Sequence, residues 1–499
     1  MEANIDMASP VKKIIVSCVV ISCVVCVCLA LIGIGWGSSI ALEPLFPQRR
    51  SLTPTRRMPT RTTTPTKPST ATPISQLNPT STQPSEGNPA DTPTSQPTEP
   101  SLPEEIANQM DEIQNQVSAL RGLQAQKSIP RNLITTDQLR QYVIEDFLKD
   151  YSAEEARQDT LELSVFGLLD PDFDLFNFYQ SLLIEQISGF YDQEKEQMYV
   201  IQGEGFGGME RFVFSHEYNH NLQDQNFDFE DGLKLDDLTC EKDNERCAAI
   251  QALIEGDSTL LSLQWLREYG TRQDMQDIQK AVGELSQPIY DSAPEFIKED
   301  FGFPYQAGQE FVQALFNEGG WEAVDQAYRD VPLSTEQILH PDRYPADKPI
   351  LVDLPDLAPV LGEGWTEITR NTMGEWYTYL ILALGVNPTT RLDQDQAKRA
   401  AEGWGGDTYV VFYNETTQTT TMVLSAVWDT TSDASEYAII LKKYLKLRFG
   451  NAIFDQANKT DWQIDEAYIQ IHLEKKQTTW IHTTTKEMAQ QIWEIVQTK

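Results

Sequence analysis

A stretch dominated by proline, threonine and serine separates the two ends of this 499-residue chain. From Pro47 to Pro103, in segments such as PTSTQPSEGNPADTPTSQPTEP, almost no large apolar side chain appears. A segment of this composition buries too little apolar surface to offset the conformational entropy that is lost on folding. We therefore expect residues 37–103 to form a disordered, partly polyproline-like stalk, so that a folded core must be built from the residues after it.

An uncharged run of 23 residues, IIVSCVVISCVVCVCLALIGIGW, precedes the stalk at residues 14–36. A helix rises about 1.5 Å per residue, so a run of this length spans the roughly 30 Å of a bilayer core. We predict a transmembrane anchor that follows an N-terminal tail at residues 1–13. Two alternatives are a cleaved signal peptide, which usually has a shorter apolar segment, and a lipid-modified cysteine at Cys23.

The charges that flank the run oppose the orientation that we favour. Lys12 and Lys13 precede the run, but five arginines follow it, and such an excess usually marks the cytoplasmic side. The first of these, Arg49, lies 13 residues beyond Trp36, and stalks of this kind commonly hold a domain away from a cell surface. We therefore predict a single-pass protein of the cell membrane with its folded part extracytoplasmic.

The charge balance restricts the partners of the chain. It has 39 Lys and Arg residues against 75 Asp and Glu residues, a formal net charge of -36. This charge repels phosphate backbones and anionic lipid head groups. We therefore expect no nucleic-acid partner, and contact with the lipid bilayer only through residues 14–36.

Two of the six cysteines, Cys240 and Cys247, lie outside the apolar run. They bracket the polar segment CEKDNERC, which a disulfide bond would close in an oxidising compartment. Two free thiols are the alternative.

The spacing of apolar residues predicts an α+β fold. A mainly helical part comes first, with helical spacing at residues 106–120, 135–151, 152–169, 248–270 and 305–328. Ser152 and Glu155 have the spacing of a capping box. Residues 189–201 have apolar segments on both sides of a polar turn, which predicts a β-hairpin.

The pattern changes beyond about Leu361. TYVVFYN and TTTMVLSAVWD predict two strands, and an amphipathic helix, a hairpin and a closing helix follow them. We therefore expect one domain at residues 104–360 and a smaller α+β domain at residues 361–499.

The segment RFVFSHEYNHNLQ carries the clearest chemical signal. His216 and His220 are four residues apart, so on a helix both imidazoles project from one face, one turn apart. Such a pair can bind one Zn2+ at about 2.0–2.1 Å, and Glu217 beside it can accept a proton from a zinc-bound water. Two solvent-facing histidines on a structural helix are the alternative.

A third zinc ligand must come from another segment. Glu255 lies in AAIQALIEGDSTLL, where an ionised carboxylate among aliphatic side chains is costly to bury unless a partner such as a metal is present. Gly256 and Ser258 are small enough to let this helix approach the histidine helix closely. Asp257 is the rival ligand, or an acceptor for a histidine N–H. A Glu255 side chain that points to solvent is the remaining alternative.

The segments HEYNHNLQDQNFD and ALIEGDS resemble those of gluzincin-type zinc metallopeptidases. They are more closely similar to poorly characterised, membrane-anchored prokaryotic proteins with an HExxH-xLQDQ-x-FD signature and a downstream EGD motif. The resemblance covers roughly Leu102 to Tyr344 and implies a zincin-like metallopeptidase core over residues 104–360. It also implies that the two histidines and Glu255 bind zinc and that Glu217 is the general base.

Zinc peptidases also need a hydrogen-bond donor for the developing oxyanion, usually a tyrosine or a histidine. Tyr305 and His340 are candidates by residue type, with a structural role as the alternative for each. Zincins generally bind an extended peptide along the edge of a strand before the motif helix. We suggest Met198–Ile201 for this edge, with an ordinary internal strand as the alternative.

These features predict a membrane-anchored zinc metallopeptidase that hydrolyses a peptide or protein substrate. One alternative is a non-catalytic surface or cell-wall-binding protein with a structural or vestigial zinc site. A zinc amidase acting on cell-wall peptides would share the chemistry and differ in its substrate.

Overall fold

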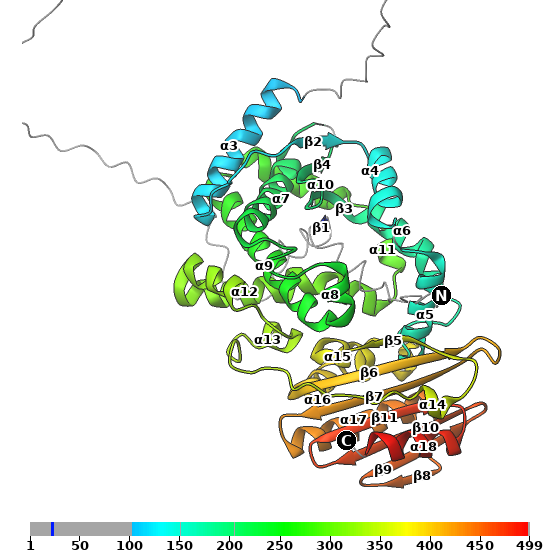
Figure 1. The fold of residues 1–499 in the computed structure, drawn as a ribbon. Helices are drawn as coiled ribbons and strands as arrows, with labels where there is room; N and C mark the ends of the chain where they lie inside the picture. Colours follow the sequence, from blue (N-terminus) through cyan, green and yellow to red (C-terminus); the bar gives the residue numbers. More distant parts are fainter. Residues whose placement is uncertain (1–20, 24–101, 150, 204, 498–499) are drawn as a thin grey trace, which may run out of the picture. The chain divides into compact units, whose positions relative to one another are not determined.

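Helices build the first part of the described chain, and an antiparallel sheet builds its last part (Figure 1). The computed structural model describes residues 21–23, 102–149, 151–203 and 205–497. The predicted tail, the predicted stalk up to residue 101 and most of the predicted anchor lie outside these residues. The predicted α+β class is confirmed.

Of the predicted anchor, the structure describes only β1 (Ile21–Cys23), which pairs antiparallel with β3 (Ile187–Asp192). Within the described part of the chain, none of the helices combines the length and the apolar composition that a bilayer crossing requires. The anchor therefore stays a prediction.

Several helices open the folded region, two of them with capping boxes. In α5 the Glu155 N–H donates to the Ser152 hydroxyl at 3.2 Å and the Ser152 N–H donates to the Glu155 carboxylate at 2.7 Å, as predicted. These paired bonds satisfy N–H groups that a helix start leaves without partners. The helices are α3 (Glu104–Arg121), α4 (Thr136–Tyr142), which continues into a π-helical turn at Val143–Phe147, α5 (Ala153–Phe166) and α6 (Leu175–Gln186).

A small sheet follows, in the order β1-β3-β4-β2. β3 and β4 (Gln197–Ile201) form the predicted hairpin, and β2 (Arg131–Ile134) pairs parallel with β4. The suggestion that Met198–Ile201 is an edge strand was therefore wrong. β2 is a four-residue strand from a distant segment and pairs parallel with β4, so no turn sequence connects the two strands. The sequence pattern therefore did not reveal this pairing.

Three long helices form the centre of the helical part: α7 (Gly208–Phe227), α9 (Asn244–Tyr269) and α12 (Glu295–Arg329). α12 is kinked at Gly319 and Gly320, where the backbone is not helical. α9 and α12 pack so closely that a Cβ atom at Gly256 would lie 2.1 Å from the carbonyl oxygen of Gly308. Gly256 was expected to let α9 approach the histidine helix, but the atoms nearest to it belong to α12, so it lets α9 approach α12 instead.

Shorter helices connect these three. α8 (Asp237–Lys242) carries Cys240, and its predicted disulfide bond to Cys247 at the start of α9 is confirmed. The others are α10 (Arg272–Glu284), α11 (Pro288–Ser292) and α13 (Thr335–Leu339).

The last part of the chain is a seven-stranded antiparallel sheet in the order β5-β6-β7-β11-β10-β9-β8. Its strands are β5 (Trp365–Asn371), β6 (Trp404–Asn414), β7 (Thr419–Trp428), β8 (Phe454–Gln456), β9 (Lys459–Ile464), β10 (Ala467–Glu474) and β11 (Gln477–Thr483). Its helices are α14 (Ala358–Leu361), α15 (Gly374–Ala383), α16 (Gln394–Ala401), α17 (Thr431–Phe449) and α18 (Lys486–Val496). β6, β7, the β10–β11 hairpin, α17 and α18 match the predicted elements.

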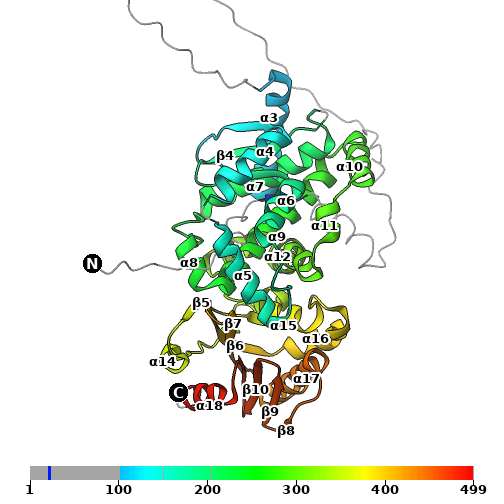
Figure 2. The same cartoon turned by 90° about the vertical axis from the view of Figure 1, so that its right-hand side faces the viewer.

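The two faces of this sheet are covered by different helices (Figure 2). Met422 and Leu424 of β7 belong to the main apolar core, which also contains Leu441 of α17. Val423, between them in sequence, packs in a second core with Ile492 of α18. This alternation is the period of two that a strand imposes on its side chains.

The close packing of α9 against α12 makes Gly256 a sensitive position. We expect Gly256→Ala to lower the free energy of unfolding by about 1–3 kcal/mol or more, because the added methyl group forces the helices apart. Gly283→Ala in α10 is the matched control. Its Cβ would meet no atom within 4 Å, so this change should be neutral or stabilise the protein by up to about 1 kcal/mol. Denaturant unfolding of both variants measures the difference, and equal stability would contradict this account of the helix packing.

Candidate metal centre

The middle of α7 is buried although its sequence is polar. The Gly207 N–H donates to the Glu210 carboxylate at 2.9 Å, which fixes the start of the helix after the glycine-rich segment. From Phe212 to Gln223 every residue is buried, including both motif histidines and Glu217. Polar groups are costly to bury unless they have partners. A solvent-facing role for the histidines is therefore wrong, and their partners must lie on neighbouring elements.

Glu255 of α9 meets both histidines. Its Oε2 lies 3.1 Å from His216 Nε2 and 3.4 Å from His220 Nε2. The side chains of the three residues are 0–3% exposed. A tetrahedral zinc ion with bonds of about 2.0–2.1 Å places its ligand atoms about 3.3–3.4 Å apart. The three residues offer ligand atoms close enough together to hold one metal ion. We call these three residues the metal cluster.

Two buried atoms of the metal cluster need a further partner. His220 Nε2 and Glu255 Oε1 are shielded from solvent and form no hydrogen bond. Leaving a buried polar atom in this state costs about 1–3 kcal/mol. A cation bound between the three side chains would interact with both atoms.

The protonation states of the cluster suit a metal. Burial lowers the pKa of His216, although its hydrogen bond with Glu255 acts in the opposite direction. Burial would by itself raise the pKa of Glu255, but the two histidines outweigh it and hold this pKa below its ordinary value. Near neutral pH these residues are a neutral imidazole and a carboxylate, the forms that bind metal ions.

A second set of contacts orients His220. Its Nδ1 lies 2.9 Å from Gln223 Oε1 and 3.2 Å from Ser258 Oγ, and Gln223 Nε2 donates to the Ile254 carbonyl oxygen at 3.0 Å. These contacts direct Nε2 toward Glu255. Gln223 was missed in the sequence, although its position three residues after His220 on one helix face was a usable signal.

Asp257, the rival ligand, has other partners. Arg121 of α3 donates to its two carboxylate oxygens at 3.0 and 3.1 Å, and the Tyr328 hydroxyl of α12 donates at 2.9 Å. Asn219 of α7 donates to the same carboxylate at 3.2 Å. Burial opposes the charge of Arg121, but Asp257 holds the pKa of this guanidinium above its ordinary value. Asp257 thus joins α9 to three helices. The sequence did not reveal this because Arg121 lies 136 residues away.

Glu217 lies beside the metal cluster and against the small sheet. It is fully buried, and a Cβ atom at Gly189 of β3 would lie only 3.3 Å from Glu217 Cγ and 2.5 Å from Val213 Cγ1. A side chain at position 189 would therefore displace α7. Glycine at position 189 leaves room for Glu217 of α7 to pack directly on β3.

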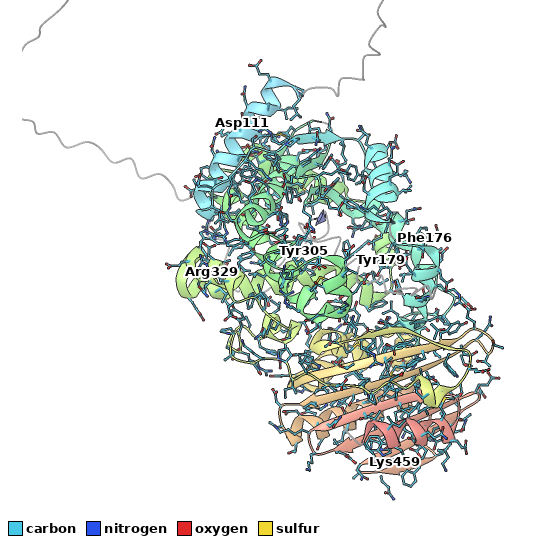
Figure 3. The ribbon with its side chains drawn as sticks, viewed as in Figure 1. Asp111, Phe176, Tyr179, Tyr305, Arg329 and Lys459 are labelled. Atoms are coloured by element: carbon cyan, nitrogen blue, oxygen red, sulfur yellow. A yellow bond between two sulfur atoms is a disulfide. The ribbon has the colours of Figure 1, made fainter. Side chains whose placement is uncertain are left out.

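The two candidate oxyanion donors lie in different places. Tyr305 of α12 has its ring centroid 6.4 Å from that of His216 and lies in the helical part of the molecule (Figure 3). His340 follows α13, and its Nε2 lies 2.9 Å from a carboxylate oxygen of Glu375 in α15. This contact raises the pKa of His340. The structure thus brings Tyr305 to the metal cluster, and it pairs His340 with Glu375 instead.

Comparison with known proteins gives one match, in the C-terminal region. Residues 361–493 match the sequence profile of a domain of unknown function, DUF8575. No curated protein and no solved structure matches the chain. The matched residues include all seven strands of the large sheet and none of the metal cluster.

Zinc affinity tests the cluster directly. We expect Glu255→Gln to weaken zinc binding at least about 100-fold, because it removes the negative charge and one ligand oxygen. We expect Gln223→Ala to weaken it about 10- to 100-fold through loss of histidine orientation. Glu268→Gln, an exposed change on the same helix, is the control and should leave affinity unchanged. Competition with a chromogenic chelator measures the affinities. If Glu255→Gln kept the original affinity, Glu255 would not be a ligand.

Proposed function

We propose that this protein is a zinc metallopeptidase with a zincin-like helical core. The observation that carries the proposal is the buried metal cluster, with Glu217 one residue from His216 and set against β3. Two histidines and one carboxylate are the protein ligands of a catalytic zinc site that keeps one position for water or substrate. Structural zinc sites usually have four protein ligands, and the metal cluster has three.

His216, His220 and Glu255 would hold the zinc ion, which when bound lowers the pKa of a water molecule and polarises a peptide carbonyl. Glu217 acts as the general base, accepting the proton of the attacking water and passing it to the leaving amine. Its buried position keeps bulk water from competing for this proton. The Tyr305 hydroxyl stabilises the developing oxyanion by a hydrogen bond.

A peptide substrate is favoured by the small sheet next to Glu217. The outer edge of β3 is paired with β1, in which Ser22 lies opposite Gly189. Residues 21–23 belong to the proposed anchor, and in the anchored protein they would lie in the bilayer and leave this edge to an extended substrate. Gly189 is also the residue against which Glu217 packs. This edge therefore has the hydrogen-bonding groups and the space to hold an extended chain beside the general base.

The proposed location is the outer side of a membrane. The uncharged run at residues 14–36 would anchor the chain, and the proline-rich stalk would hold the folded part away from the bilayer. The disulfide bond between Cys240 and Cys247 suits an oxidising extracytoplasmic compartment.

Glu217→Gln separates metal binding from turnover. We expect zinc-loaded full-length protein to hydrolyse fluorogenic peptides in a chelator-sensitive manner. The variant should retain zinc affinity and lose at least about 100-fold in kcat, because the amide cannot accept the proton. Glu268→Gln should keep wild-type activity. Zinc binding by the wild-type protein without hydrolysis of any peptide in a broad library would favour a binding protein instead.

Tyr305→Phe tests the oxyanion contact. We expect kcat to fall about 10- to 100-fold with KM nearly unchanged, because the lost hydrogen bond is formed mainly in the transition state. Tyr269→Phe on the exposed end of α9 serves as the control for loss of a hydroxyl. A Tyr305→Phe variant with wild-type kcat would remove Tyr305 from the mechanism.

A further inference from the structure

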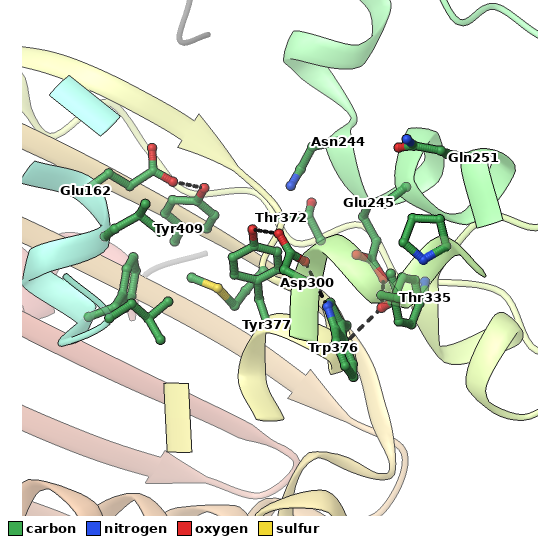
Figure 4. A pocket seen from close by; sticks show the side chains of 17 residues that line it. Glu162, Asn244, Glu245, Gln251, Asp300, Thr335, Thr372, Trp376, Tyr377 and Tyr409 are labelled. Atoms are coloured by element: carbon green, nitrogen blue, oxygen red, sulfur yellow. Dashed lines mark hydrogen bonds between the residues drawn. The ribbon is translucent and has the colours of Figure 1, made fainter. Parts of the chain in front are cut away.

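A cavity of about 60 Å³ lies between the helical part and the large sheet (Figure 4). One side is formed by α5, α9 and α12, and the other by α15, β6 and the segment before α15. A water molecule needs about 10–15 Å³ of such space, so the cavity has room for several atoms of one extended side chain.

The pocket begins one helical turn from the metal cluster. Asn244, Ala248 and Gln251 of α9 line it, and with Glu255 they are spaced by four, three and four residues. This spacing places all four on one face of the helix. Gln251 is about 6 Å along the helix axis from Glu255. On α12, Pro304 lines the pocket, and the next residue, Tyr305, lies beside His216.

This distance fits a substrate side chain near the cleaved bond. An extended peptide advances about 3.3 Å per residue. A side chain one to three residues from a peptide bond at the metal cluster is therefore long enough to reach the pocket.

The pocket is lined by acidic side chains and by no basic one. Its lining includes the carboxyl groups of Glu162, Glu245 and Asp300, and no lysine, arginine or histidine is among the described residues that line it. All three carboxyl groups interact with neutral donors. Their partners are Tyr409 for Glu162, Thr335 for Glu245, and Trp376 and Tyr377 for Asp300.

The remaining polar groups add acceptors. Gln251 is 5% exposed, its amide end is directed toward the pocket, and its Oε1 has no hydrogen-bond partner (Figure 4). Asn244 Oδ1 is also buried without a partner. Phe303 and Trp376, whose rings stack on each other with centroids 4.5 Å apart, also line the pocket. Acceptors, carboxylates and aromatic rings together match a cation that carries several N–H donors on an apolar stem.

The protonation of the carboxyl groups is consistent with this ligand. Burial raises the pKa of Asp300 to about 6, so this group remains mostly ionised above neutral pH. Burial raises the pKa of Glu245 to about 8, so this group is mostly neutral near pH 7 in the empty pocket. A cation bound beside it would favour its ionised form.

We propose that this pocket binds the cationic side chain of a lysine or arginine in the substrate and directs cleavage to a peptide bond within about three residues of it. The proposal rests on the proposed peptidase function. One face of α9 then has two roles: it carries the metal ligand Glu255, and it forms one wall of the pocket that binds the substrate side chain.

Binding to a variant that does not turn over tests the pocket separately from catalysis. The protein is zinc-loaded, full-length Glu217→Gln, and the probes are N-acetylated fluorescent peptides that differ only in one central Lys, Arg, norleucine or Glu residue. We expect the Lys and Arg peptides to bind at least about tenfold more tightly than the norleucine peptide, by fluorescence anisotropy. Adding Asp300→Asn or Glu162→Gln should reduce this preference to less than about threefold. Adding Asp395→Asn, an exposed change on α16, should leave it intact.

The outcomes separate the two proposals. Equal binding of Lys and norleucine peptides, tighter binding of the Glu peptide, or a preference unchanged in both pocket variants would overturn the pocket assignment. A non-acetylated norleucine peptide tests whether the pocket binds an amino terminus. If the preference appeared only for this free amino terminus, the pocket assignment would also be overturned. Failure of the zinc-loaded wild-type protein to hydrolyse any of these peptides would instead count against the peptidase function, while selective binding to Glu217→Gln would still support the cation pocket.

Discussion

The burial of charged and polar side chains between α7 and α9 is the constraint on which much of the structure depends. Glu255 lies in an apolar helix with no solvent contact, so its charge requires a partner, and the two histidines of α7 provide it. These contacts fix the rotation of both helices about their axes. α9 also packs closely on α12 at Gly256, and this packing brings Tyr305 of α12 beside His216.

The neighbouring carboxylates of α9 have different roles because of helix geometry. Glu255 and Asp257 are two residues apart, so they project about 200° apart around the helix axis. One faces the metal cluster, and the other faces Arg121 and Tyr328. The Arg121–Asp257 ion pair is fully buried and hydrogen-bonded on several sides. It supports the metal cluster from the opposite face of α9 without taking part in it.

In the proposed function the large sheet takes part in substrate binding, because it lies next to α9. Trp376, Tyr377 and Tyr409 lie within the residues that match DUF8575 and line the acidic pocket. The helical part supplies the rest of the lining, including Asp300 and Gln251. In the proposed function the helical part therefore supplies the chemistry, and both parts together recognise the substrate. The binding preference of the pocket then depends on residues that are more than 100 positions apart in the chain.

The sequence alone determined the local features of this protein, and tertiary structure decided the distant ones. Helical periodicity, the Ser152 capping box and the 189–201 hairpin depend on residues close in sequence, and the structure confirms them. The histidine pair and the choice of Glu255 followed from helix spacing and from the cost of burying a charge. The internal position of β4, the Arg121 partner of Asp257, the pairing of His340 with Glu375 and the acidic pocket did not follow. Each depends on contacts between segments far apart in the chain, where side-chain spacing along one element contains no information about the partner.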